Sequence, residues 1–270
     1  MGKQKLHITI LTSLVTIIGL ISCEKQIDWQ LQEGKQFVIV DALLTNEYRY
    51  QVVWVYTSVN NMNESSLPII NAEVKLSDGE NTVTYIADTN KPGRYISPIP
   101  FRAAAGRTYK LTVHYNDIFD TAYAQMEGIT PIGAAVIVPW DSLYRYNYVP
   151  SSLPSMMEIY YFWSHNQEFT EKYGADNAAE TFYSLNIIDI SKEFAPPKKV
   201  IIFPTGTTII RRKYSLSEPH QHFIRSLLLE TEWRGGIFDV EQGNVPTNFR
   251  HGTLGWFGAC MVLMDTVNVQ

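Results

Sequence analysis

The sequence predicts a mainly β protein: an N-terminal immunoglobulin-like antiparallel β-sandwich, followed by a second β-rich domain that carries one amphipathic helix. Three observations predict this class. Short runs of β-branched and aromatic residues recur between turn residues, several runs alternate apolar and polar side chains, and helical periodicity is clear only in residues 217–232. With 45% hydrophobic residues, the chain can fill the cores of such domains.

The chain begins with the three-part layout of an export signal. Lys3 and Lys5 form a basic head, residues 8–21 are almost purely apolar, and Cys23 follows within two residues. The apolar stretch is shorter than the ~20 residues that a permanent membrane helix needs, so an uncleaved anchor is the weaker interpretation. The run Leu-Ile-Ser-Cys resembles the bacterial lipobox, whose cysteine is diacylated on sulfur and becomes the mature N-terminus. We therefore expect residues 1–22 to be a lipoprotein signal peptide and Cys23 the lipid attachment site.

Cleavage would leave an acidic chain with one unpaired cysteine. The sequence has 22 basic and 27 acidic side chains, and the signal peptide holds two of the basic ones and no acidic one, so the mature net charge is −7. This balance argues against nucleic acid as a partner. Cys260 has no disulfide partner and lies in an alternating apolar stretch, so we expect a buried, unreactive thiol. Residues 23–35 are polar and are expected to be a lipidated tether.

Residues 36–130 carry the pattern of the first domain, the Ig-like sandwich. The runs FVIVDALLTN (37–46) and YRYQVVWVYTS (48–58) predict two neighbouring strands. Residues 73–85 alternate polar and apolar side chains on both sides of an Asp-Gly turn, and residues 109–115 alternate again before an Asn-Asp turn. Strands this short and regular indicate an antiparallel sandwich.

Residues 131–270 form the predicted second domain. Residues 131–139 look like a crossover, with a proline at each end, and MEIYYFWS, ETFYSLNIIDIS and KKVIIFPTGTTIIRRKYSL predict strands. The final run LGWFGACMVLMDTVNV (254–269) is expected to close the second sheet. It returns to strand-like composition after a segment rich in Gly and Pro.

The helix of the second domain is predicted at residues 217–232. Ser217 can cap it, and Pro219 suits its first turn. Apolar residues then recur at spacings of three and four, from Phe223 to Leu228, which is the pattern of a helix with one buried face. Gly235 and Gly236 follow its end.

Motifs that would identify an enzyme are absent from the sequence: it contains no G-x-S-x-G, phosphate-binding loop, H-E-x-x-H or C-x-x-C. His220 and His222, two apart on a helix, point in divergent directions, so we expect no metal site there and place both in solvent. Asp239 and Glu241 could share a face as paired carboxylates, although acids in such a loop are more often turn residues. No cofactor is expected.

Aromatic residues supply the better candidate for a binding surface. Trp140, Tyr144, Tyr146 and Tyr148 surround Arg145 in a segment rich in loop formers, and exposed Trp and Tyr are side chains on which protein partners and sugars pack. The alternative is that these rings fill the seam between the two domains.

A second aromatic–arginine pair follows the helix. Trp233 and Arg234 could anchor a partner, but we favour a role for Trp233 as a helix stop against the sheet.

Several of these stretches carry a family resemblance. The lipobox, NAEVKLSDG, PGRY with AGRTYKLTV, and GGIFDVEQGNVPTNF followed by LGWFGACMV resemble a lipoprotein family of Bacteroidota that is catalogued as a domain of unknown function, family 4249. The resemblance spans nearly the whole chain. It implies an envelope lipoprotein commonly encoded beside a TonB-dependent outer-membrane receptor with a carboxypeptidase-like regulatory domain, and it implies no catalytic residues. The residues after Asn248, Phe249 to His251, depart from the family pattern.

Two classes of function follow. The first is a non-catalytic outer-membrane lipoprotein, held by lipid on Cys23, that is an accessory or ligand-binding partner of an outer-membrane receptor. The second is an envelope glycan-binding protein or glycan hydrolase, in which residues 140–148 hold a saccharide and Asp239 or Glu241 does acid–base work. The ligand, a peptide or a saccharide, and the face of the membrane stay open. Arg234 belongs to the same candidate surface as these two acids.

Overall fold

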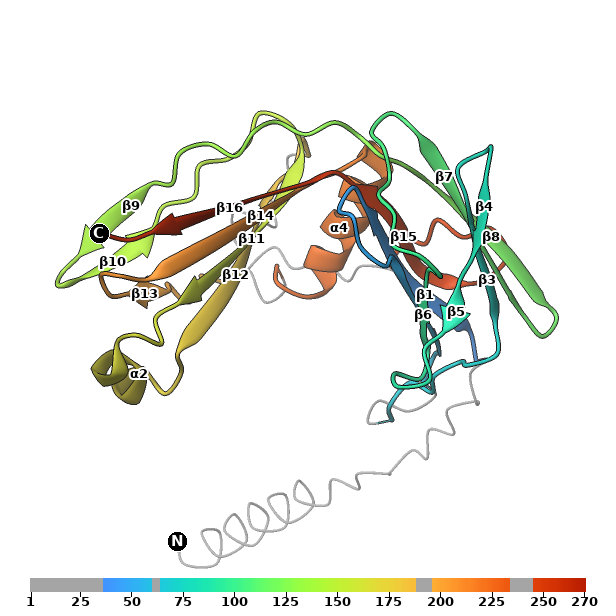
Figure 1. The fold of residues 1–270 in the computed structure, drawn as a ribbon, viewed down its shortest axis with the longest axis horizontal. Coiled ribbons are helices and arrows are strands. Elements are labelled where there is room, and N and C mark those ends of the chain that lie inside the picture. The colour runs from blue at the N-terminus through green and yellow to red at the C-terminus, as the bar shows by residue number, and fades with distance from the viewer. Residues whose placement is uncertain (1–35, 60–63, 188–195, 234–244) are drawn as a thin grey trace, which may run out of the picture. The chain divides into compact units, whose positions relative to one another are not determined.

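The computed structural model describes residues 36–59, 64–187, 196–233 and 245–270, whose arrangement is shown in Figure 1. These residues form strands β1 to β16 and two helices, so the predicted mainly β fold class is confirmed. The predicted signal peptide, tether and lipid attachment site at Cys23 lie outside the described residues, as do Arg234, Asp239 and Glu241. Residues 36–270 form one compact unit.

A two-sheet sandwich forms from the first half of the chain together with one strand from its end. One sheet has the order β15-β1-β2-β6-β5 and the other β4-β3-β7-β8. The strands are β1 (Val38–Thr45), β2 (Val52–Thr57), β3 (Glu73–Ser77), β4 (Thr82–Thr84), β5 (Ile86–Ala87), β6 (Arg94–Ile96), β7 (Thr108–Tyr115), β8 (Ile118–Gln125) and β15 (Leu254–Cys260).

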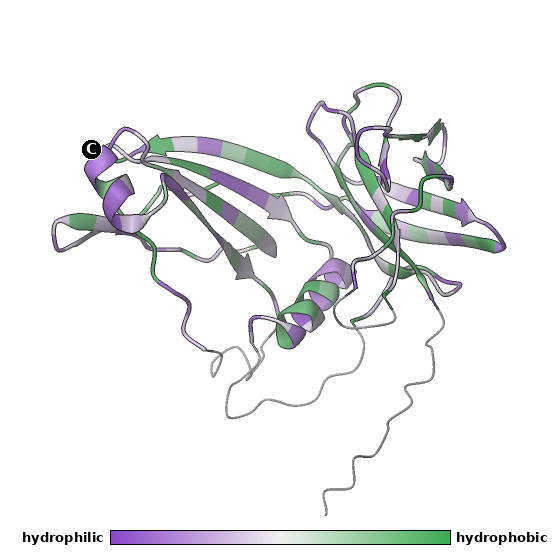
Figure 2. Ribbon diagram, turned by 90° about the horizontal axis from the view of Figure 1, so that it is seen from below, coloured by the Kyte–Doolittle hydropathy of each residue, from purple (hydrophilic) through white to green (hydrophobic). Residues whose placement is uncertain are grey.

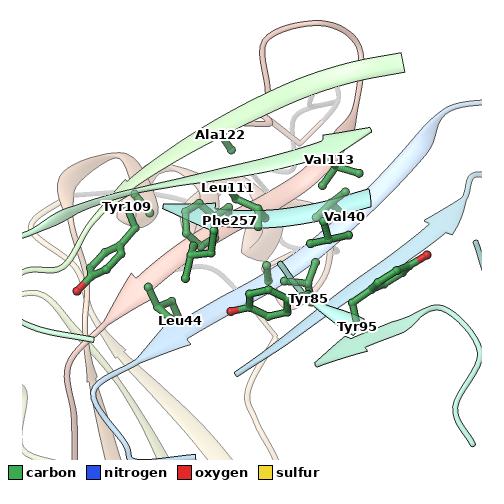
Figure 3. Packing of buried hydrophobic residues seen from close by; sticks show 14 of the residues in the cluster. Val40, Leu44, Tyr85, Tyr95, Tyr109, Leu111, Val113, Ala122 and Phe257 are labelled. Atoms are coloured by element: carbon green, nitrogen blue, oxygen red, sulfur yellow. The ribbon is translucent and has the colours of Figure 1, made fainter. Parts of the chain in front are cut away.

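The core of the sandwich comes from the alternation that the sequence shows. Along β7, Tyr109, Leu111 and Val113 are buried, whereas the residues between them are not. They pack with Val40 from β1 and Phe257 from β15, as the close-up in Figure 3 shows.

The position of β15 corrects the prediction that residues 254–269 close the second sheet. Only the last part, β16 (Val262–Asn268), does so, whereas β15 pairs in parallel with β1. Gly255 permits this pairing, because it has φ +93° and a Cβ there would lie 2.0 Å from the Val40 carbonyl oxygen. Met261 is the one residue between the two strands, so the chain passes directly from the sandwich to the second sheet.

The second region contains two further sheets. The larger has the order β12-β11-β14-β16 and the smaller β13-β10-β9. Their remaining strands are β9 (Ile137–Trp140), β10 (Leu143–Tyr146), β11 (Ser155–Phe162), β12 (Asn177–Ser184), β13 (Ile202–Phe203) and β14 (Thr208–Ser215). The aromatic segment expected to be a loop is therefore largely a hairpin: β9 and β10 pair across a tight turn in which Asp141 has φ +54°.

Two helices are described. The predicted helix is confirmed as α4 (Glu218–Glu230), with Ser217 at the N-cap position and Ile224 and Leu228 buried. Figure 2 shows hydrophobic and hydrophilic residues side by side along it. Helix α2 (Gln167–Tyr173) was not predicted from the sequence; it is a two-turn helix whose N-cap, Asn166, accepts a hydrogen bond from the Phe169 N–H.

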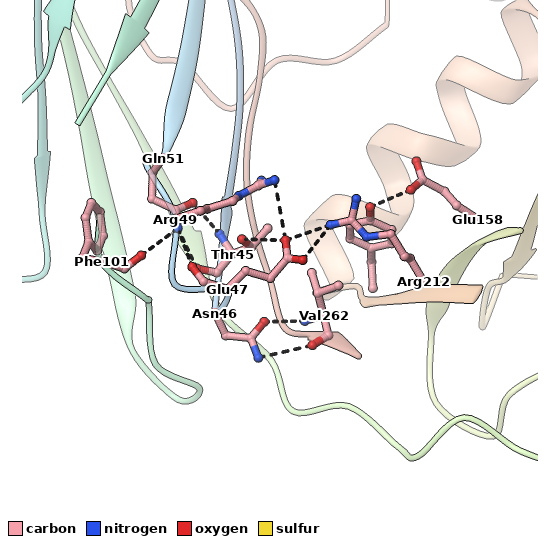
Figure 4. Close-up of polar contacts among 10 residues, drawn as sticks. Thr45, Asn46, Glu47, Arg49, Gln51, Phe101, Glu158, Arg212 and Val262 are labelled. Atoms are coloured by element: carbon pink, nitrogen blue, oxygen red, sulfur yellow. Dashed lines mark hydrogen bonds and ion pairs between the residues drawn. The ribbon is translucent and has the colours of Figure 1, made fainter. Parts of the chain in front are cut away.

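Polar contacts join the sandwich to the larger sheet of the second region. Glu47 forms an ion pair with Arg212 at 2.8 Å, and Asn46 bonds both to the N–H and to the carbonyl of Val262 (Figure 4). The buried Lys213 ammonium donates to the carbonyl and hydroxyl of Thr130, in the segment that connects the two regions. The Lys213 contacts hold the start of the crossover segment against β14.

Candidate functional site

The hairpin divides the predicted aromatic surface into a cation–π pair, Trp140 with Arg145, and a packed set of tyrosines. The Trp140 side chain is 43% exposed, and the Arg145 guanidinium lies 4.5 Å from the centroid of its ring. A cation over an indole face is a stabilising contact. Trp140 and Arg145 therefore form a cation–π pair on the β9–β10 hairpin, in which Trp140 is exposed and Arg145 is half-buried.

The three tyrosines of the segment instead pack on the second core. Tyr148 stacks on Phe182 with ring centroids 4.4 Å apart, and its hydroxyl bonds to that of Ser184 at 2.6 Å. The Tyr146 hydroxyl accepts a hydrogen bond from Arg211. Burial raises the pKa of Tyr148, as expected for a ring in apolar surroundings. Tyr144, Tyr146 and Tyr148 thus serve packing within the second region.

At the end of α4, Trp233 packs against the sheet, as expected for a helix stop. Trp233 is 7% exposed and belongs to the cluster that joins α4 to β14 and β16. Its partner in the candidate surface, Arg234, lies outside the described residues, as do Asp239 and Glu241. The paired-carboxylate hypothesis stays a prediction.

The expectation that both helix histidines lie in solvent is wrong for His220. His222 is exposed, but His220 is 8% exposed, because Gly258 of β15 has no side chain where the imidazole packs. Its Nδ1 lies 3.6 Å from the Cys260 sulfur. Burial lowers the pKa of His220 to about 4 and raises that of Cys260 to about 12, so both groups are neutral at pH 7.

This pair is therefore a packed structural contact. A thiol with so high a pKa supplies no thiolate, and the burial predicted for Cys260 is confirmed. Within the described ranges, no three His, Cys, Asp or Glu side chains converge as a metal site would require.

The second region contains a groove that was not predicted from the sequence. Its cavity volume is about 910 Å³, within the ~300–1,000 Å³ typical of ligand sites. Three parts of the second region line it: the first half of β12, the end of α2 with Trp163 before it, and the segment 196–202 that leads into β13. Most of its lining is apolar.

The wall near α2 is aromatic and rigid. Phe169 stacks on Tyr173 with centroids 4.2 Å apart and meets Trp163 edge to face at 5.3 Å. The Trp163 indole N–H donates to the Ala175 carbonyl at 2.7 Å, which fixes the ring. The Asn166 cap holds α2 in the position from which Phe169 reaches this wall.

Charged groups lie at the floor and rim of the groove. Glu180 lies in β12, and burial raises its carboxyl pKa although the Tyr161 hydroxyl donates to it. Lys198 pairs with Glu232 at 2.5 Å and also donates to the Thr181 carbonyl at 3.3 Å. Lys199 is exposed and makes no ion pair with a described residue.

Sequence patterns offered one weak signal for this groove. Pro196 and Pro197 followed by Lys198 and Lys199 break the strand pattern, which is typical of a surface segment. The groove itself arises because this segment lies opposite β12, and no local periodicity reports that relation.

Comparisons with known proteins concern the family and the fold. The model of a family described as "Domain of unknown function (DUF4249)" matches residues 24–266. None of the curated proteins matches the chain. Among solved structures, the FN1–FN3 domains of chicken CNTN1 align with a TM-score of 0.30 and 10% identity, over 65% of this chain and 59% of that one.

The described part of the chain includes no helix with the length and apolar character needed to cross a membrane.

Proposed function

The chain belongs to the DUF4249 family, and we propose that it is a non-catalytic lipoprotein of the cell envelope that serves as an accessory or ligand-binding partner of an outer-membrane TonB-dependent receptor. The proposed anchor is lipid on Cys23, supported by the basic head, the short apolar run and the lipobox-like end of residues 1–23. Two acyl chains attach a protein stably to a bilayer, because each buried methylene contributes ~0.8 kcal/mol.

The groove beside β12 is the observation that carries the binding part of this proposal. It combines an apolar, aromatic wall with a few polar groups, which is the usual composition of a ligand site. The charged groups placed on it suit recognition: Lys198 pairs with Glu232, whereas Lys199 makes no ion pair with a described residue and can meet a ligand at the rim.

The cation–π pair of the exposed Trp140 and the half-buried Arg145 is the proposed docking surface for the receptor. Trp and Arg are the residue types most enriched among side chains that dominate binding energy, and here the ring is already oriented by the guanidinium. A pre-ordered pair loses little side-chain entropy on binding.

Saccharide binding in the same groove is a second candidate. Tyr173 favours it, because its side chain is 44% exposed and its ring is held by stacking on Phe169, with the Lys172 ammonium 5.6 Å from the ring centroid. The hydrolase form of this candidate needs Asp239 or Glu241, which lie outside the described residues.

Affinity purification from detergent-solubilised envelopes tests the proposal. We expect an outer-membrane receptor to co-purify in stoichiometric amount with the wild type and to be lost with Trp140→Ala, whereas Phe119→Ala, an exposed aromatic of the sandwich, should retain it. Cys23→Ala should move the protein from the detergent phase to the aqueous phase in Triton X-114 partitioning, or leave it as precursor. Glycan affinity in the absence of any receptor would support the second candidate instead.

A further inference from the structure

The groove contains the outer edge of a β-sheet. Strand β12 is the last strand of the order β12-β11-β14-β16, so one of its sides pairs with β11 and the other faces away. Residues Asn177 to Thr181, the first five of β12, line the groove. A ligand in the groove therefore meets backbone groups as well as side chains.

The pairing register identifies which backbone groups of β12 point into the groove. Trp163 N–H donates to the Asp176 carbonyl at 2.9 Å, and the register continues through Phe162↔Asn177 and Tyr161↔Ala178. In an antiparallel pair, residues that exchange two hydrogen bonds alternate with residues that exchange none. It follows that Asn177, Ala179 and Thr181 direct both N–H and C=O away from β11.

These outward N–H and C=O groups recur at every second residue, as they do along an unpaired edge of a β-sheet. Among the described residues, the backbone of Asn177 and Ala179 has no backbone partner on this side. The Lys198 ammonium caps the Thr181 carbonyl, which independently supports the register. A lysine over an exposed edge also discourages uncontrolled pairing between sheets.

We propose that the groove binds one extended peptide segment of another protein, which adds to β12 as a further strand. An added strand lies ~4.8 Å from its neighbour and sends every second side chain to the same face, so apolar side chains at alternate positions would reach the wall of Trp163 and Phe169. The proposal rests on the proposed function in one respect, that the groove is a ligand site.

The walls of the groove favour a single strand over a second copy of this chain. The segment 196–202 and α2 face the edge of β12, so the outward groups lie within a groove instead of at a flat sheet edge. An isolated peptide can enter such a space, whereas the edge of a folded sheet brings neighbouring strands that these walls would meet.

Charge at the rim favours an acidic peptide. Lys198 is paired with Glu232, and the Glu180 carboxyl accepts a hydrogen bond from the Tyr161 hydroxyl, which leaves Lys199 as the lysine of the described lining that has no ion-pair partner among the described residues. A carboxylate on the peptide complements it. The ligand class is thus an extended segment with alternating apolar side chains and an acidic residue.

Fluorescence anisotropy of the detergent-solubilised full-length protein tests the proposal directly. The probe is a fluorescein-labelled octapeptide in which valine alternates with threonine and one threonine is replaced by glutamate. Two further peptides carry N-methyl groups on one or the other alternate set of backbone nitrogens. We expect the probe to bind, one N-methylated peptide to lose at least tenfold in affinity, and the other to bind as the probe does. Equal binding of both N-methylated peptides, or no binding of the probe, would overturn the proposal.

Matched proline variants on the two edges of the same sheet test the protein side. Ala179→Pro removes an outward N–H of β12, and Thr266→Pro removes the equivalent N–H of β16, because the Val269 N–H donates to the Thr207 carbonyl and the register places Thr266 outward. We expect Ala179→Pro to weaken probe binding at least tenfold and Thr266→Pro to leave it unchanged. Unchanged binding by Ala179→Pro would contradict strand addition.

Two comparisons complete the test. Lys199→Glu should weaken binding of the glutamate probe several-fold and leave unchanged the binding of a probe with glutamine in its place; equal effects on both would overturn the acidic preference. Receptor co-purification, measured on the same variants, separates the two proposals. A receptor that co-purifies with a protein that binds no peptide refutes only strand addition, and peptide binding without a receptor refutes only the proposed partner.

Discussion

The carboxylate of Asp120 holds residues 250–253, which directly precede β15, and its removal should destabilise the sandwich. Its side chain is fully buried in β8. One oxygen accepts from the Arg250 N–H at 2.8 Å, and the other accepts from the His251 and Thr253 N–H groups at 2.9 and 3.0 Å. Asp120 thereby positions the loop that leads β15 to its place beside β1.

The substitution Asp120→Asn keeps the shape and replaces one acceptor oxygen with a donor. If the amide retains the bond from Arg250, the N–H groups of His251 and Thr253 lose their acceptor. The Thr253 N–H is a buried donor, and leaving it unpaired costs about 1–3 kcal/mol, so the free energy of unfolding should fall by at least roughly this amount, with a smaller addition from the partly buried His251 N–H. This is a large part of the ~5–15 kcal/mol of a typical domain.

Urea denaturation at pH 7 measures this loss. The control is Asp117→Asn, the same substitution at an exposed position in the turn of the same hairpin, which should change the free energy of unfolding by less than about 0.5 kcal/mol. If Asp120→Asn is as stable as the control variant, the three N–H bonds do not hold the loop, and the reasoning is refuted.

The pH dependence of stability gives a second check on Asp120. Burial opposes ionisation, but the N–H donors of Thr253, His251, Arg250 and Thr121 outweigh it and hold the carboxyl pKa below its ordinary value. A lowered folded-state pKa means that the contribution is fully present above the unfolded pKa of about 3.9 and is lost as pH falls through the folded value. Wild type should therefore lose stability below about pH 4 more steeply than Asp120→Asn does.

The other predictions concern single contacts. Gly255→Ala should prevent stable folding, because its Cβ would meet the Val40 carbonyl, whereas Gly106→Ala, with φ +77° and no atom within 4 Å, should cost only about 1–2 kcal/mol; thermal melts compare them. Because burial lowers the pKa of His220 to about 4, the free energy of unfolding should fall as pH drops from about 6.5 to 4. Urea denaturation at several pH values measures this fall, and a His220→Gln variant that shows the same pH dependence as wild type would contradict the prediction. Tyr144→Ala should lower the melting temperature through lost packing, whereas Trp140→Ala should leave it nearly unchanged. If calorimetry finds the reverse, Trp140 and not Tyr144 is the side chain that packs on the core.

Most strands and the longer helix could be predicted because their signals are local. Alternation in residues 109–115 and the three–four spacing from Phe223 to Leu228 each report which side of one element is buried. The helix α2 escaped prediction because two turns contain too few residues to show periodicity, and the signal that could have found it was the Asn166 cap before Phe169.

The candidate site was predicted less well, because sequence patterns report only relations between residues close together in the chain. Trp140 and Arg145 could be named from composition, but composition does not separate them from Tyr144, Tyr146 and Tyr148, since all five occur in one segment. Their separation depends on which side of the β9–β10 hairpin meets Phe182 and Phe203, residues distant in the chain.

By itself, the sequence determined the mainly β class, the strand-and-turn series up to residue 130, the α4 helix and the expectation of lipid on Cys23, all of which depend on residues close together in the chain. Only the tertiary structure decided that β15 joins β1, that Asp120 anchors the loop before it, and that an open edge of β12 faces the segment 196–202. Such pairings are selected by backbone hydrogen bonds and shape between distant residues, and a strand's own sequence specifies which face is buried without specifying its neighbour.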